Sequence, residues 1–340
     1  MDVIGILTAG GDCPGLNAVV RGVVARATER HDVEVVGILD GWEGLLEGRT
    51  RPLDRAAVRG ILQRGGTILG TSRRDPYVHG DGYAGVRGTL EANGIEALVV
   101  VGGDGTLRSA LRLYGEGLPV VAVPKTIDND IPATDLTFGF DTAVQVATEA
   151  IDRLTTTAEA HNRIMLVEVM GRTKGWIAVH AGIAAGADAI LIPELPYDLD
   201  EVARIIRARH RRGHTYSVVV VAEGVRLPDG ERPVRLDALG FERLGGVSHR
   251  LAPLLEERTG FETRVTVLGH VQRGGTPTAF DRVLATRFGV AAADLAVAAR
   301  FGTMVALRGS ELVDVPLADA CAEIRGVPPA LYDVARTFWG

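Results

Sequence analysis

The stretch VPKTIDNDIP, residues 123–132, gathers chemically active side chains directly after an apolar run. One of its aspartates could accept the proton of an attacking hydroxyl while another lies near a metal ion. Asx-turn hydrogen bonding would explain a single aspartate, but it explains the whole group less well. The group consists of Asp128, Asp130, the hydroxyl of Thr126 and the ammonium of Lys125.

Two other segments combine an expected strand, a glycine turn and an expected helix. In LTAGGDCPGLNAVVRG (7–22), glycines would let backbone N–H groups approach a phosphate at the start of the helix. This segment matches neither the P-loop nor the dinucleotide-binding pattern, so an ordinary tight turn is an open alternative. In VVVGGDGTLRSA (99–110), Asp104 could hold a hydrated Mg2+ beside phosphates, or it could only cap the helix.

Arginines occur at the ends of two later strands. MGRTKGW (170–176) and HVQRGG (270–275) place a basic residue beside glycine, and Arg163 and Arg264 lie in the strands before them. Arginine suits bidentate capture of a phosphate, although a single arginine at a sheet edge is more commonly solvated. Four such positions favour anion binding, whereas His270 alone would favour a structural role.

The elements that must position these residues follow an α/β rhythm. Short β-branched runs bounded by glycine alternate with amphipathic stretches, which predicts parallel sheets covered on both faces. A long helix over 141–161, with Asp141 as its expected N-cap, separates two such units near residues 138–141. A second helix is expected over about 174–185, and the polar interval 224–240 reads as a surface excursion. In the simplest strand order the stretch at 123–132 lies near the GGDGT turn.

Composition excludes several classes of protein. The 340 residues are 46% hydrophobic and 24% charged, as in a packed globular protein. A net charge of -6 argues against a nucleic-acid partner, and no apolar run approaches the ~20 residues that span a bilayer. Cys13 and Cys321 match neither a disulfide framework nor a zinc site. We therefore expect a soluble cytoplasmic protein that binds neither nucleic acid nor membrane.

Taken together, the motifs resemble those of the phosphofructokinase A family, which phosphorylates fructose 6-phosphate at its 1-hydroxyl in glycolysis. The resemblance covers most of the chain in order. The motifs that carry it are LTAGGDCPGLNAVVRG, GGDGT, PKTIDNDI, TFGFDTA (137–143), RIMLVEVMGR (163–172), VAEG (221–224), VLGHVQRGG (267–275) and DRVLATRFG (281–289).

The resemblance implies roles for individual residues. Asp128 resembles the catalytic base, Thr126 positions the hydroxyl or the phosphoryl group, and Arg172 offsets the charge that develops there. Asp104 and Asp130 are expected to hold Mg2+. The donor is expected to contact Gly11, Arg73, Gly103, Asp104, Gly105 and Thr106, and the sugar phosphate Thr126, Asp128, Arg163, Met170, Gly171, Arg172, Glu223, Arg264, His270 and Arg273.

The family also implies an architecture: two doubly wound, mainly parallel α/β domains with the active site in the cleft between them. A larger donor-binding domain would comprise 1–138 plus about 251–301, and a smaller sugar-phosphate domain 139–250 plus about 302–340. In the family, the residues matching Arg163 and Arg264 reach in from a neighbouring subunit. A homodimer or homotetramer with shared active sites is therefore expected.

Two residues bear on the phosphoryl donor. Within the family, Gly105 is typical of ATP users, since a carboxylate there would crowd and repel the α-phosphate, whereas Lys125 is typical of pyrophosphate users. We give Gly105 more weight, because an added lysine need not exclude ATP. ATP is the expected donor, and a reversible pyrophosphate-dependent enzyme is the alternative.

Two further points concern regulation and activity. Ala25 stands where allosteric members carry a second effector arginine, with Arg26 following, which argues against classical effector control. A non-catalytic, metabolite-binding subunit is disfavoured, because every expected catalytic carboxylate and arginine is present.

Overall fold

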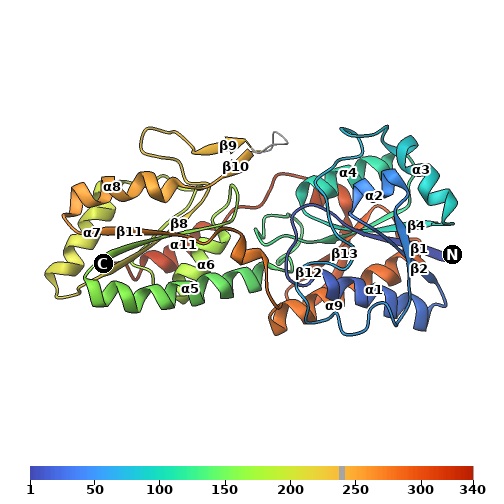
Figure 1. Ribbon diagram of the computed structural model, residues 1–340, viewed down its shortest axis with the longest axis horizontal. Coiled ribbons are helices and arrows are strands. Elements are labelled where there is room, and N and C mark those ends of the chain that lie inside the picture. The colour runs from blue at the N-terminus through green and yellow to red at the C-terminus, as the bar shows by residue number, and fades with distance from the viewer. Residues whose placement is uncertain (237–241, 340) are drawn as a thin grey trace. The chain divides into compact units, whose positions relative to one another are not determined.

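The computed structural model describes residues 1–236 and 242–339, which form two compact units. Unit 1 comprises Met1–Thr142 and Arg273–Ile324. Unit 2 comprises Ala143–Gln272 and the residues from Arg325 onward. Each unit contains a mainly parallel sheet with helices packed on it (Figure 1), so the predicted α/β class is confirmed.

The sheet of unit 1 has seven strands in the order β13-β12-β5-β4-β1-β2-β3. The pairs from β12 through β5, β4 and β1 to β2 are parallel, while β13 and β3 join the two edges antiparallel. β4 and β5 are buried along their whole length, as expected of strands covered on both faces. The strands are β1 (Val3–Thr8), β2 (Glu34–Ile38), β3 (Thr50–Leu53), β4 (Ala97–Gly102), β5 (Val120–Pro124), β12 (Thr303–Arg308) and β13 (Glu311–Pro316).

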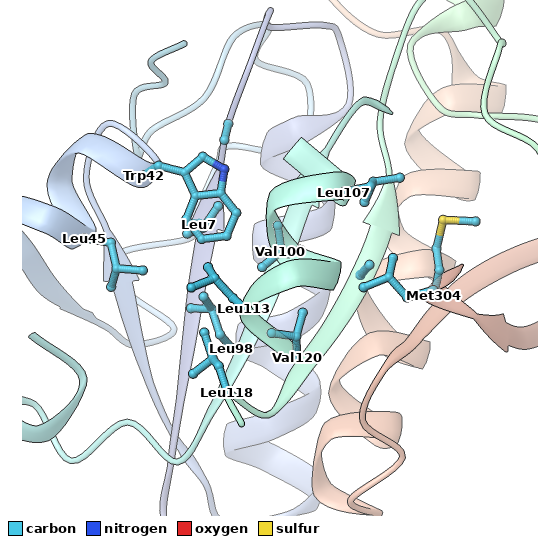
Figure 2. Packing of buried hydrophobic residues seen from close by; sticks show 14 of the residues in the cluster. Leu7, Trp42, Leu45, Leu98, Val100, Leu107, Leu113, Leu118, Val120 and Met304 are labelled. Carbon is cyan, nitrogen blue, oxygen red and sulfur yellow. The ribbon is translucent and has the colours of Figure 1, made fainter. Parts of the chain in front are cut away.

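Helices cover both faces of this sheet. α1 (Leu16–Arg30) and α9 (Ala279–Val297) pack together on one face. The other face carries α2 (Trp42–Glu47), α3 (Tyr83–Ala92), α4 (Asp104–Gly115) and α10 (Leu317–Ala320). Figure 2 shows the core on that side, where Trp42 and Leu107 pack with strand residues such as Leu98 and Val100. This core fixes the positions of the strands, and the candidate site residues described below follow the ends of these strands.

Unit 2 has a four-stranded parallel sheet in the order β11-β6-β8-β7. Its strands are β6 (Ile164–Val169), β7 (Ala189–Leu191), β8 (Ser217–Ala222) and β11 (Thr263–Val267). Its helices are α5 (Phe140–His161), which begins in unit 1, α6 (Trp176–Ala184), α7 (Leu199–Arg211), α8 (Val247–Thr259) and α11 (Pro329–Arg336). A short 3-10 helix, η1 (Gly269–Arg273), follows β11. Over the described residues, no helix is long and apolar enough to cross a membrane.

The compact units differ from the predicted domains at residues 139–142, which belong to unit 1, and in two longer segments. Residues 251–272 belong to unit 2, because β11 pairs with β6 and α8 packs on β11. Residues 302–324 belong to unit 1, because β12 pairs with β5 and β13 pairs with β12. In both segments, the strand pairing determines to which unit the residues belong, and their position along the sequence does not.

Two local predictions are corrected. Asp141 is not the N-cap of α5, because the helix already begins at Phe140 and the N–H of Thr142 bonds to Asp281 from α9. The second helix begins at Trp176, two residues later than expected. In the interval 224–240, β9 (Val234–Leu236) pairs antiparallel with β10 (Glu242–Leu244), which follows the interval, and residues 237–240 lie outside the described part.

Candidate active site

Three turns of unit 1 lie at one edge of its sheet. β5, β4 and β1 are adjacent and parallel, so the turns that follow them meet at their carboxyl ends. The N–H of Lys125 donates to the carbonyl of Gly102 at 2.9 Å, and the N–H of Ala9 donates to that of Val101 at 3.0 Å. The predicted proximity of the PKTIDND stretch to the GGDGT turn is therefore confirmed.

Asp128 lies in the PKTIDND stretch and has one carboxylate oxygen without a hydrogen-bond partner among the described residues. The side chain is buried, and its Oδ1 has no hydrogen-bond partner among the described residues. The backbone N–H of Asp128 donates to Thr126 Oγ1 at 3.0 Å, while the Thr137 hydroxyl donates to the Thr126 carbonyl at 2.8 Å. A rigid loop thus presents a carboxylate oxygen that can accept a proton.

Asp104 and Asp130 are the carboxylates predicted to hold a metal ion. Asp104 is the first residue of α4 and does not cap it, because Gly103 occupies the N-cap position. The Asp104 carboxylate instead accepts from Arg108 Nε at 2.9 Å, and Asp130 is buried in the neighbouring turn. No cluster of three metal-ligating side chains occurs among the described residues. Two carboxylates on adjacent turns nevertheless fit Mg2+, which completes its shell with water and phosphate oxygens.

The glycine turn after β1 is flanked by two cationic side chains. The Arg273 guanidinium donates to the carbonyl of Asp12 at 3.1 Å, and the Lys125 ammonium donates to the carbonyl of Gly11. A Cβ at Gly11 would lie 2.7 Å from Arg273 Nη1, so a side chain at this position would displace the guanidinium of Arg273. Burial lowers the pKa of Lys125, and the nearby Arg273 charge lowers it further. Arg273 was predicted at the sugar phosphate; within unit 1 it lies at the predicted donor turn.

A second segment joins the same turn. The N–H of Gly10 donates to the carbonyl of Ser72 at 3.0 Å, and the Thr71 hydroxyl donates to the carbonyl of Gly10 at 2.6 Å. These bonds place the exposed Arg73 directly beyond residues that contact the turn. Arg73, Gly11 and Lys125 therefore belong to one neighbourhood.

Gly105 leaves open space beside this neighbourhood. It is the second residue of α4, its φ is not positive, and a Cβ built on it would meet nothing within 4 Å. A glycine inside a helix costs about 1 kcal/mol relative to alanine. Neither the backbone conformation nor close packing requires glycine at this position. The choice of glycine therefore points to a role for the open space beside it. Thr106, the next residue, is buried beneath the turn.

In unit 2, the turn after β6 carries Met170, Gly171 and Arg172. The N–H of Arg172 donates to Glu223 Oε1 at 2.9 Å, and Arg172 adopts a left-handed φ of 54°. The N–H of Met170 donates to Gln272 Oε1 at 3.4 Å. Four of the predicted sugar-phosphate residues thus lie at the carboxyl ends of the adjacent strands β6 and β8, and Arg172 has a strained backbone there. Gln272, which is fully buried, was not predicted.

Arg163 and Arg264 share a counter-ion that sequence reasoning missed. Glu262 Oε2 lies 2.5 Å from Arg163 Nε, and its other oxygen accepts from Arg264. The hydrogen bond from Arg163 lowers the pKa of Glu262. The acid two residues before Arg264 was the only available signal, because Arg163 is 99 positions away. His270 lies exposed on η1.

Comparisons with known proteins agree on the family. A model of the family described as Phosphofructokinase matches residues 3–296. The chain belongs to the phosphofructokinase family. It is thus a member of a family of phosphotransferases, and the family that the motifs resemble is confirmed.

The family relatives divide over the donor. The chain is 55% identical, over 99% of both chains, to a Streptomyces coelicolor protein named pyrophosphate–fructose 6-phosphate 1-phosphotransferase. It is 54% identical, over 99% of both chains, to an ATP-dependent 6-phosphofructokinase of Mycobacterium tuberculosis. Equal similarity to both leaves the donor to be decided by individual residues.

Solved structures support the same fold. Phosphofructokinase of Pichia pastoris in the T-state superposes with a TM-score of 0.84 at 34% identity, over 99% of this chain and 38% of that one. This chain therefore spans well under half of the yeast chain. A pyrophosphate-dependent phosphofructokinase of Marinobacter aquaeolei, 22% identical, shares the fold with a TM-score of 0.83 over 97% of this chain and 86% of that one.

Proposed function

We propose that this chain is a 6-phosphofructokinase that transfers the γ-phosphoryl group of ATP to the 1-hydroxyl of fructose 6-phosphate. The observation that carries the acceptor chemistry is the unpartnered, buried Oδ1 of Asp128. A carboxylate oxygen held without a partner in a rigid loop costs stability, which a role in proton transfer explains. The named activities of relatives at 54–55% identity agree with this acceptor.

The reaction is an in-line displacement. The 1-hydroxyl oxygen attacks the γ-phosphorus, its proton passes to Asp128 Oδ1, and the bond to the β–γ bridging oxygen breaks so that ADP leaves with the electron pair. Thr126, whose hydroxyl receives the N–H of Asp128, holds the base in place. Arg172 offsets the charge that develops on the transferred group.

The donor phosphates bind at the glycine turn in this proposal. Backbone groups of Gly11 and Gly103–Thr106, together with Arg73, receive them at the start of a helix. Asp104 and Asp130 would hold Mg2+, which neutralises phosphate charge when bound. The sugar phosphate is held by Arg163, Arg264, His270 and Arg273, with Met170, Gly171 and Glu223 beside the sugar.

ATP as the donor rests on Gly105. The empty space around it leaves room for a bulky donor, and glycine in a helix has no packing reason there. A specific observation favours the alternative, a pyrophosphate-dependent enzyme: the Lys125 ammonium lies at the Gly11 turn, where it could pair with a short donor. The Lys125 ammonium already donates to the carbonyl of Gly11, and burial disfavours its charged form. We therefore give the pyrophosphate-dependent alternative less weight.

The assembly is proposed to be a homo-oligomer with shared sites. Arg163 and Arg264 are both paired with Glu262. Arg264 lies on the edge strand β11, Glu262 directly precedes that strand, and Arg163 directly precedes the neighbouring strand β6. Following the family, these arginines would serve the active site of a neighbouring subunit.

The deciding experiment measures initial rates of fructose 1,6-bisphosphate formation with Mg2+ and either ATP or pyrophosphate. We expect turnover with ATP and at least ~100-fold less with pyrophosphate, as expected when a site is built for one donor. Turnover with pyrophosphate alone would make Lys125 decisive, and no turnover with either donor would refute the proposed activity.

A further inference from the structure

Three strand ends of unit 2 meet around the turn that carries Arg172. β6, β8 and β7 are adjacent and parallel, so the segments that follow them lie at one edge of the sheet. Arg172 follows β6, Glu223 follows β8, and Glu194 follows β7. Arg172 and Glu223 have proposed roles in phosphoryl transfer and sugar binding, whereas Glu194 has none.

The turn from Gly171 to Gly175 is held by a carboxylate near each end. The N–H of Arg172 donates to Glu223 Oε1 at 2.9 Å, and the N–H of Gly175 donates to Glu194 Oε1 at 2.9 Å. Arg172 adopts a left-handed φ of 54°. Such a strained conformation persists only where the surrounding structure fixes it. The two carboxylates supply that restraint on either side of the strained residue.

The backbone of this turn also packs closely on the neighbouring strand ends. A Cβ at Gly175 would lie 2.3 Å from Ile192 Cγ2 and 2.5 Å from its Cβ. A Cβ at Gly224 would lie 2.2 Å from the carbonyl oxygen of Arg172. Both close approaches require glycine, so the segments after β7 and β8 support the turn directly.

The same oxygen of Glu194 binds a distant segment, Arg325–Val327, where the chain passes from unit 1 into unit 2. The N–H of Val327 donates to Glu194 Oε1 at 3.1 Å. The indole N–H of Trp176 donates to the carbonyl of Arg325 at 3.0 Å, and the Arg325 guanidinium lies 4.6 Å from the centroid of that ring. Because Trp176 is the first residue of α6, the entering segment is anchored directly beyond the turn.

We propose that Glu194 is a positioning residue for phosphoryl transfer. Its carboxylate holds the turn that places the Arg172 side chain, and it ties this turn to the segment Arg325–Val327. Glu194 touches no substrate, and the inference rests on the proposed role of Arg172. Without Glu194 the turn loses an acceptor, so Arg172 can relax out of its strained conformation. A misplacement of about 1 Å can cost on the order of 10²-fold in rate.

A double-mutant cycle between Glu194→Ala and Arg172→Ala tests this role. Glu194→Ala should lower kcat about 10- to 100-fold in the otherwise wild-type enzyme and have little further effect in Arg172→Ala, because it acts through that side chain. Glu194→Gln keeps an oxygen that can accept both N–H groups, so it should retain most of the activity. Glu257→Ala, which removes an exposed glutamate of α8 in the same unit, is the control. An equal fall in kcat in both backgrounds would overturn the proposal.

Amide hydrogen exchange tests the contacts without turnover. Glu194→Ala should speed exchange over residues 171–175 and 325–327 together, whereas Glu194→Gln and Glu257→Ala should not. Trp176→Phe removes the indole N–H but keeps an aromatic ring, and it should also speed exchange over both segments. This variant keeps the coupling testable if Glu194→Ala does not fold.

Unchanged exchange over residues 171–175 in both Glu194→Ala and Trp176→Phe would overturn the proposal. If Glu194→Ala does not fold, unchanged exchange there in Trp176→Phe would do so. No turnover of the wild type with either donor would refute the proposed function and with it the catalytic role of Glu194. The exchange result would still decide whether Glu194 holds the turn, so the two failures can be told apart.

Discussion

Asp128 illustrates at the scale of a single residue how a site departs from the rules of stable packing. Buried polar atoms are nearly always hydrogen-bonded, yet Asp128 Oδ1 has no partner in the described chain. Its neighbours are bonded to one another and hold the loop around it. An unsatisfied atom inside a satisfied loop is the pattern expected of a group that acts on a substrate.

Replacing Asp128 with Asn should remove the base and keep the shape. We expect kcat to fall about 10²- to 10⁴-fold while KM for fructose 6-phosphate changes little. Steady-state kinetics and a urea unfolding curve measure the two effects separately. Asp135→Asn, which alters an exposed aspartate seven residues later, is the control and should retain activity. A folded Asp128→Asn enzyme with near-normal kcat would rule out the assigned base.

Gly105 allows a charge test of the donor site. Gly105→Asp should lower kcat/KM for ATP at least ~100-fold, because a like charge beside a phosphate costs several kcal/mol. Gly105→Ala is the steric control: its Cβ meets nothing within 4 Å, so ATP activity should persist. The alanine variant should also be more stable, by up to about 1 kcal/mol, in chemical unfolding. Equal ATP kinetics in both variants would show that no phosphate lies near this position.

At the scale of elements, Asp281 links the beginnings of two helices. This fully buried residue of α9 accepts from the N–H of Gly139 at 2.9 Å and from the N–H and hydroxyl of Thr142 at 2.8 and 2.6 Å. It thereby satisfies the N–H of Thr142 in the first turn of α5, a task predicted for Asp141. Phe138, beside Gly139, bridges to Lys125, so this link also supports the candidate site.

The titration of Asp281 predicts a pH dependence of stability. Burial raises its pKa from 3.8 to about 6, so the folded state holds the proton more tightly than the unfolded state. Its contribution to the free energy of unfolding is therefore greatest below pH 3.8 and is lost as the pH rises through about 6. Between pH 7.5 and 5 the wild type should gain about 1 kcal/mol relative to Asp281→Asn.

Urea unfolding of both proteins across this pH range measures the difference between their free energies of unfolding. Groups that titrate alike in both proteins cancel from this difference. Asn cannot accept from all three donors, so the variant should also be less stable at neutral pH by roughly 1–3 kcal/mol. Parallel pH profiles would show that Asp281 does not titrate in this range. Glu323→Gln, at an exposed position of unit 1, should follow the wild type.

At the scale of the whole molecule, the expected sharing of active sites can be tested by complementation. Asp128→Asn and Arg264→Ala chains, each inactive alone, can be co-expressed with different tags and purified as mixed oligomers. If each site takes its base from one subunit and Arg264 from another, a mixed dimer regains one intact site and about half of the wild-type activity. Arg250→Ala in place of Arg264→Ala is the control, because it removes an exposed arginine of the same unit. Activity no greater than that of the parents would show that each chain supplies both residues to its own site.

The sequence by itself determined what depends on neighbours along the chain. Glycine turns between apolar runs and amphipathic stretches predicted the α/β class, and the order of the strands placed PKTIDND beside GGDGT, because parallel strands end at one edge. The motifs also identified the family. These features rest on local conformation and on spacing, which can be read directly from residue types.

Only the tertiary structure decided which distant residues meet. Asp281 lies 142 positions from Gly139, and Glu262 lies 99 positions from Arg163, so no local pattern links them. The same holds for β12, which belongs to unit 1 because it pairs with β5. Such contacts follow from burial and strand pairing in space, whose energies depend on partners far away in the sequence.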